Sequence, residues 1–275
     1  MFGKLIKHEF KAMGRVLLPI VAALLLVSVL ANFAIDVLDN SDSGIVANAL
    51  SGLIVGAWVI ALIALSTVVT VVIVLRFYRS VLCPEGYLTM TLPVSTEEVI
   101  FSKIIASVVW FIIAGIAIFL SLSFGLVNVD EIKTAFTGDW KEAFAALKSS
   151  VGLGNVILFL AEILLLIAVS SGVKILHFYL AMAIGQCADN GKVFKMILAY
   201  FGINIVMTIF TVKLIPAVGN LFENIGKSAL FSSSGEMLNS GAVHSVMLLA
   251  ILLSAVVGAV YFLPTDKLIK KKLNI

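Results

Sequence analysis

Charged residues are scarce in this chain. Only 13% of its 275 residues are Asp, Glu, Lys or Arg, whereas 61% are hydrophobic. A soluble domain usually has about a quarter of its residues charged and about half apolar. One water-soluble globule of this size cannot bury so much apolar surface, so lipid must form part of the solvent. The net charge is only +3, and the basic residues are scattered in short groups, which argues against a nucleic-acid partner.

Cysteine and histidine are also rare, with 2 Cys and 3 His in the whole chain. Cys83 and Cys187 both fall in loops that we expect in the cytoplasm, where thiols stay reduced. The sequence has no Cys/His cluster with the spacing of a zinc site. We therefore expect two free thiols, no disulfide framework, no metal site and no cofactor bound by this chain itself.

The sequence also lacks a Gly-x-x-x-x-Gly-Lys-Ser/Thr loop, whose backbone N–H groups would hold the phosphates of a nucleotide. The nearest match runs from Leu221 to Ser228, but it has leucine in place of the first glycine and follows no predicted strand. We expect the chain to have no enzymatic activity of its own. Energy for any transport must then come from a partner subunit or from an ion gradient.

Long apolar runs dominate what the sequence does contain. A helix needs about 20 apolar residues to cross a bilayer core. Six runs are long enough, and each is apolar on all faces rather than along one stripe. They predict an all-α integral membrane protein with a single transmembrane domain over residues 1–275. The predicted spans are 16–38, 52–75, 104–129, 153–184, 194–215 and 243–263.

The distribution of Lys and Arg predicts the orientation of these spans, because cytoplasmic loops carry an excess of basic residues. The first predicted outer loop, residues 39–51, has no basic residue at all. Basic residues gather instead before the first span, in the predicted inner loops and in the tail at 264–275. Both termini are therefore expected in the cytoplasm.

Two further helices are expected to lie in the membrane interface. Residues 2–15 read as a separate element with apolar residues on one helical face and basic residues on the other, which suits contact with anionic lipid. Residues 136–147 place Trp140 and other apolar residues on one face and predict a helix on the outer leaflet. The loop 216–242 begins with a proline and is expected to form short turns or a shallow re-entrant segment.

Residues 76–103 form the one substantial polar break on the predicted cytoplasmic side. Pro84 suits the first turn of a short helix, where its missing N–H costs nothing, and Glu85 complements the positive N-terminal end of that helix. Pro93 disfavours helical geometry in the residue before it, so the helix should stop there. The apolar side of this predicted helix comprises Tyr87, Leu88, Met90, Thr91 and Leu92.

Ser95 and Glu98 follow this stop and precede a long apolar run. Ser-x-x-Glu at such a place is a capping box, in which each side chain accepts a hydrogen bond from the backbone N–H of the other residue. We therefore predict that the third long helix begins at about Thr96 and enters lipid near Ile104. The short helix before it would lie across the membrane axis. On this pattern alone it is either a docking element or a tight connector against the bilayer.

The chain resembles the permease subunits of ABC transporters of the ABC-2 type at these residues. Those proteins carry a coupling segment between spans two and three, with Glu-Gly, a few apolar residues, Pro-Val-Ser, and a Lys that opens span three. The chain has only Arg76 and Arg79 where family members often carry a more basic run. The matching residues are Glu85, Gly86, Leu88, Leu92, Pro93, Val94, Ser95 and Lys103.

The resemblance implies six spans with both termini inside and a basic amphipathic helix before span one. It implies that residues 80–92 dock into a separate ABC ATPase subunit, which would bind ATP and Mg. It also implies a second permease subunit, either a copy of this chain or a different one. The residues expected to take part in coupling are Pro84, Glu85, Gly86, Tyr87, Leu88, Leu92, Pro93, Ser95 and Glu98.

A few polar residues inside the spans are candidates for a transport path, because such residues usually face a bundle interior or a water-filled route. Glu162 lies deep in span four. It either lines a transport path or is protonated and hydrogen-bonded to a neighbouring helix. Lys174 and His177 share a helical face near the inner boundary. Asn204 and Thr208 are four residues apart in span five and suit hydrogen bonds to a partner helix.

Three functions fit this sequence. The first is the transmembrane subunit of an ATP-driven exporter in a bacterial plasma membrane, with a peptide, a lipid-like compound or a drug as cargo, since Val, Ile, Leu and Phe would line its path. The second is a proton-coupled secondary transporter that uses Glu162 and His177. The third is a membrane sensor or immunity component that recruits a cytoplasmic partner without transporting anything.

Overall fold

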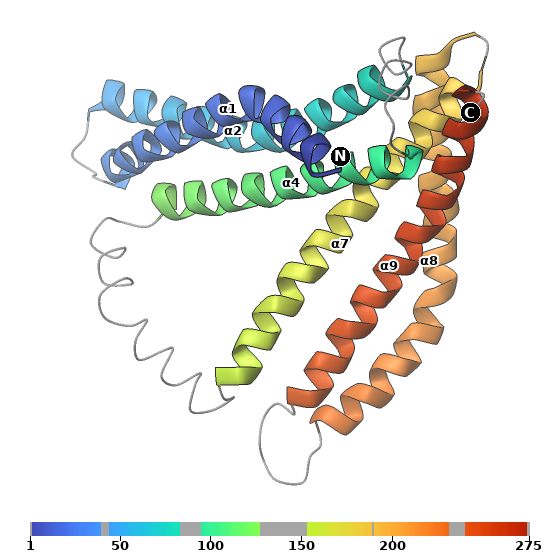
Figure 1. The fold of residues 1–275 in the computed structure, drawn as a ribbon. Helices are drawn as coiled ribbons and strands as arrows, with labels where there is room; N and C mark the ends of the chain where they lie inside the picture. Colours follow the sequence, from blue (N-terminus) through green and yellow to red (C-terminus); the bar gives the residue numbers. More distant parts are fainter. Residues whose placement is uncertain are drawn as a thin grey trace. The chain divides into compact units, whose positions relative to one another are not determined.

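A computed structural model describes residues 2–39, 44–82, 95–126, 153–188, 190–230 and 240–273. All regular structure in these ranges is helical (Figure 1). The helices are α1 (Phe2–Asp39), α2 (Ile45–Phe77), the short π-helix η1 (Tyr78–Leu82), α4 (Thr96–Leu126), α7 (Leu153–Gln186), α8 (Lys192–Leu230) and α9 (Ser240–Leu273).

Six of these helical stretches are long and apolar enough to cross a membrane. The prediction of an all-helical chain with six helices of membrane length is confirmed over the described residues. Long apolar helices suit a bilayer because each satisfies its backbone hydrogen bonds internally. The stretches are Phe2–Leu38, Ile45–Leu82, Thr96–Gly125, Gly154–Gln186, Lys192–Leu214 and Val243–Lys271.

The helices differ from the predicted spans at several ends. Residues 2–15 are continuous with the first span in α1, so the prediction of a separate element there is wrong. Helix α1 runs without a break through Gly14 and Pro19. The second helix begins at Ile45, seven residues before the predicted span.

The prediction of turns after Pro216 is also wrong up to Leu230, because α8 continues through that proline. A proline inside a helix removes one backbone hydrogen bond, and helices of membrane proteins tolerate this loss. Two predicted elements, the short helix at 84–92 and the outer helix at 136–147, lie outside the described residues. Seven of the predicted coupling residues therefore lie outside them as well: Pro84, Glu85, Gly86, Tyr87, Leu88, Leu92 and Pro93.

The described helices divide into two compact units. The N-terminal unit contains Met1–Leu75 and Ile105–Ala146. In it, Trp110 of α4 stacks on Phe10 of α1 with ring centroids 5.0 Å apart, and its indole N–H donates to the Phe10 carbonyl at 3.2 Å. Trp58 of α2 donates to the Ser121 hydroxyl of α4 at 3.0 Å. A buried tryptophan thus joins α4 to α1, and a second one joins it to α2.

The C-terminal unit contains Arg76–Ile104 and Leu147–Ile275, and α7, α8 and α9 run side by side in it (Figure 1). Glu162 contacts His244, 82 residues further along the chain, and His177 contacts Tyr261, 84 residues further. This nearly constant separation means that α7 and α9 are parallel. Helix α8 follows α7 after a short turn and returns antiparallel to it.

Candidate functional site

Both flanks of the predicted coupling segment belong to the C-terminal unit. The flank that leads into the segment ends with Phe77 and η1. Phe77 stacks on Tyr179 of α7 with ring centroids 3.6 Å apart, and both side chains are fully buried, as is Val81 in η1. The chain therefore enters the segment from a position fixed against α7.

The flank that leaves the segment begins with the predicted capping box. The backbone N–H of Glu98 donates to Ser95 Oγ at 3.2 Å, and the backbone N–H of Ser95 donates to Glu98 Oε2 at 3.1 Å. Helix α4 begins at Thr96, as the sequence predicts. These two bonds satisfy N–H groups that would otherwise lack partners at the start of a helix. Both features of this helix start are confirmed.

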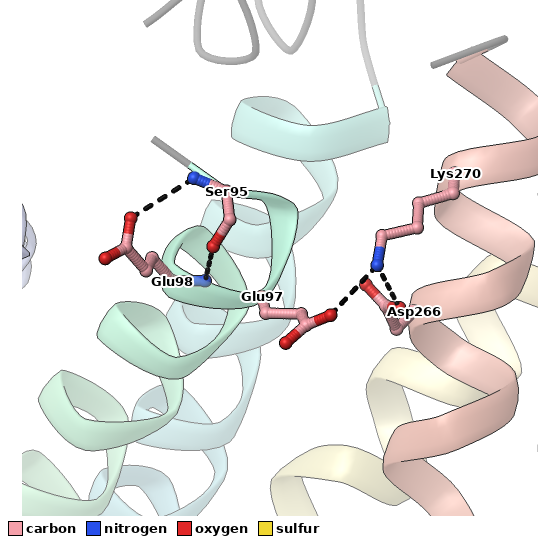
Figure 2. A network of polar contacts seen from close by, with 5 residues as sticks. All are labelled: Ser95, Glu97, Glu98, Asp266 and Lys270. Carbon is pink, nitrogen blue, oxygen red and sulfur yellow. Dashed lines mark hydrogen bonds and ion pairs between the residues drawn. The ribbon is translucent and has the colours of Figure 1, made fainter. Parts of the chain in front are cut away.

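Glu97, in the same first turn, joins α4 to α9. Lys270 Nζ lies 3.0 Å from Glu97 Oε1 and 2.6 Å from Asp266 Oδ2 (Figure 2). Asp266 and Lys270 are four residues apart, which places them on the same face of α9. The exposed fraction of the side chain falls from 54% for Glu97 to 39% for Lys270 and 12% for Asp266. The network thus runs from a solvated carboxylate to a buried one.

Apolar contacts continue this junction along both helices. The rings of Phe101 and Phe262 have centroids 4.7 Å apart, and Val99 and Ile100 are buried on the same part of α4. Lys103, which the resemblance places at the opening of span three, is 2% exposed. A ring contact therefore accompanies the ion pair between the start of α4 and the C-terminal part of α9.

Glu162 pairs with a residue that sequence reasoning missed. His244 Nδ1 on α9 lies 2.8 Å from Glu162 Oε2 on α7, and both side chains are largely buried. The sequence contains only a weak signal for this pair. Glu162 and His244 are two ionisable residues in the predicted outer parts of spans four and six, in a chain that has few ionisable residues. The structure supports the reading of Glu162 as a residue bonded to a neighbouring helix.

His177 is the centre of a second polar contact, where three helices meet. The amide nitrogen of Asn204 lies 3.3 Å from His177 Nε2 and donates to the Tyr200 carbonyl at 3.1 Å. Since that nitrogen only donates, Nε2 must accept, which leaves His177 Nδ1–H to donate to the Tyr261 hydroxyl at 3.4 Å. Tyr200 also packs edge-on against the His177 ring.

These contacts bear on the polar residues that the sequence analysis singled out inside the spans. The hydrogen bond of Asn204 to a neighbouring helix is confirmed. The Thr208 hydroxyl donates to the Asn204 carbonyl of its own helix at 2.8 Å. A Thr in a helix readily takes this local acceptor. The side chain of Lys174 is exposed, whereas that of His177 is half-buried.

The two polar contacts form separate layers. Glu162 and His177 are 15 positions apart on α7, or about 22 Å at the helical rise. Between these layers, the sequences 163–176, 205–212 and 245–260 contain one ionisable residue, the exposed Lys174. The described helices therefore offer no continuous chain of titratable groups from one layer to the other.

No group of three or more His, Cys, Asp or Glu in the described ranges is placed to hold a metal ion. No protein-family model, curated protein or solved structure matches the chain.

Proposed function

We propose that this chain is the transmembrane subunit of an ATP-driven exporter of the ABC-2 type. A separate ATPase subunit would bind ATP and Mg, dock onto the coupling segment and drive the helices between two arrangements. A second permease subunit would complete the path in a bacterial plasma membrane. The cargo class that suits the apolar helices is an amphipathic or hydrophobic compound.

One observation carries this proposal. The segment from Glu85 to Ser95 resembles the coupling segment of these permeases, and the helix after it begins with a complete capping box. Both flanks of the segment are built into one unit, through Phe77 on α7 and through Glu97 and Phe101 on α9. A docking segment needs such anchorage, because a force applied to a loosely held loop would move only that loop.

The test is co-purification with the ATPase encoded beside this chain, followed by replacement of Glu85 and Gly86. Removing a central contact of an interface typically weakens binding by about tenfold or more. We expect Glu85→Ala and Gly86→Leu each to reduce recovery of the ATPase and its membrane-bound activity by about that factor. Thr89→Ala is the matched control within the segment and should have no effect. Unchanged complex formation in both variants would refute the assignment.

Proton-coupled transport is the second candidate, and the Glu162–His244 pair is the observation that favours it. In an ATP-driven exporter this pair is helix glue, which in membrane proteins contributes about 1 kcal/mol. We expect Glu162→Gln to lower stability by about that amount. Efflux of a lipophilic dye from vesicles should keep its pH dependence in this variant. Loss of that dependence would favour the proton-coupled transporter instead.

A further inference from the structure

The two carboxylates at the junction between α4 and α9 differ in exposure. The Asp266 carboxylate is 12% exposed, and Lys270 stays beside it on the same helix. Glu97 is on the other helix and is 54% exposed. If α4 moved away, Glu97 would be solvated by water at little cost, whereas the buried Asp266 would keep its cation. The contact between helices can therefore open without leaving a buried charge unpaired.

Asp266 also has spare capacity to hold Lys270. Its Oδ1 atom is buried and has no hydrogen-bond partner among the described residues. An ammonium group has three donors, so Lys270 can turn from Glu97 toward this second oxygen when the helices part. A buried acceptor without a donor is unfavourable in the closed arrangement, which reduces the free-energy difference between closed and open.

The closed contact fixes a residue inside the capping box. Glu97 lies in the first turn of α4, between Thr96 and Glu98, so its position sets where the coupling segment ends. On the other side, α9 is parallel to α7 and contacts it through the His244–Glu162 and Tyr261–His177 pairs. A displacement passed to the end of α9 therefore acts on a helix that is tied to α7 at two levels.

We propose that Glu97, Lys270 and Asp266 form a releasable clasp, in which Glu97 and Lys270 are positioning residues that pass movement of the coupling segment to α9. The role in coupling rests on the proposed function, whereas the clasp itself does not. The clasp is closed when Lys270 bridges both carboxylates and open when it binds Asp266 alone.

Hydrogen exchange of the purified chain in lipid nanodiscs tests the clasp without an ATPase. Solvated ion pairs contribute little, so we expect Glu97→Gln to speed exchange of the amides at 99–104 only about threefold. Exchange at 262–271 should not change in this variant, because Asp266 keeps Lys270. Lys270→Gln should speed exchange in both stretches, since it leaves a buried carboxylate alone. The control Lys267→Gln, an exposed neighbour on α9, should alter neither.

The asymmetry is the deciding result. A rigid brace would loosen both stretches together in Glu97→Gln, and that outcome would overturn the clasp, as would no change in either stretch. Glu97→Asp keeps the charge on a shorter side chain and should restore most of the protection at 99–104. Because Glu97 is exposed, its variant should fold normally even if Lys270→Gln does not.

The coupling role is tested on the complex with the ATPase, using ATP and vanadate to trap one state. In the wild-type complex, trapping should change exchange at 262–271. In Glu97→Gln the ATPase should still bind, and that change should shrink about threefold. An unchanged response would overturn the coupling role. Failure of the ATPase to bind the wild-type chain would refute the proposed function and the coupling role together, while the exchange test on the chain alone still decides the clasp.

Discussion

Gly185→Ala is expected to force α7 and α8 apart and to destabilise the chain by about 3 kcal/mol, the upper range for overpacking. A Cβ atom at Gly185 would lie 2.6 Å from the backbone nitrogen of Met196 and 2.7 Å from its Cα, and it would also meet Met196 Cγ. A side chain can rotate away from such a contact, but the backbone of α8 cannot. The first turn of α8 must therefore move as a whole.

The turn between the two helices leaves little room for that movement. Cys187 and Ala188 donate backbone hydrogen bonds to Ile184 and Gly185 at 3.1 and 3.3 Å. Gly191 then has a positive φ of 66°, a backbone angle that residues other than glycine rarely adopt. The close approach at position 185 is thus set by a short, bonded turn, and a longer path is not available.

Gly154→Ala, near the start of α7, is the matched control, because a Cβ there meets nothing within 4 Å. It should leave stability unchanged or raise it slightly, since alanine favours a helix over glycine. Unfolding in a denaturing detergent, followed by circular dichroism, measures both variants. Equal stability of Gly185→Ala and Gly154→Ala would contradict the close packing of α7 on α8.

Local sequence signals predicted some features of this fold well. Ser95, Glu98 and the preceding Pro93 are enough to place the start of α4, because a capping box involves only residues within one helical turn. Runs of apolar residues were also enough to find six helices of membrane length. They were not enough for the helix ends, since α1 begins at Phe2 and runs without a break into the first span, and α8 continues through Pro216.

Local sequence signals could not predict contacts between residues that are far apart in the chain. Glu97 and Lys270 are 173 residues apart in sequence, and no spacing rule links them. Which helices pack together, and whether they run parallel, decides such pairs. In a membrane the apolar pattern gives little help, because lipid-facing and helix-facing residues are equally apolar. The partner of Glu162 was missed on this account, although His244 is one of 3 His in the chain.

Phe77→Ala, on the other flank of the predicted coupling segment, should have a similarly large effect on stability. Phe77 is 1% exposed, and its ring lies flat on that of Tyr179, which is fully buried. Replacing a buried Phe with Ala typically costs about 3 to 5 kcal/mol, because the surrounding atoms only partly fill the cavity. We expect a loss of about 3 kcal/mol in the detergent unfolding assay, toward the lower end because η1 can shift.

Leu75→Ala is the control for this change, because Leu75 lies two residues earlier on α2 and is 46% exposed. It should alter stability by less than about 0.5 kcal/mol, as surface substitutions usually do. Phe77→Leu should fall between the two variants, since leucine keeps much of the volume but loses the ring contact. Phe77→Ala with wild-type stability would contradict the stack on Tyr179.

Phe77 and Glu97 are held by different kinds of contact. Phe77 is held by buried ring packing that cannot open without leaving a cavity, whereas Glu97 is held by a solvated ion pair that can. Hydrogen exchange should therefore show little opening at 78–82 in the wild-type chain and measurable opening at 99–104. If the predicted coupling segment passes movement to α9 as proposed, its end at Phe77 must stay fixed while its end at Glu97 is released. Phe77→Ala should then weaken the response of α9 in the proposed complex even when Glu97 and Lys270 are intact.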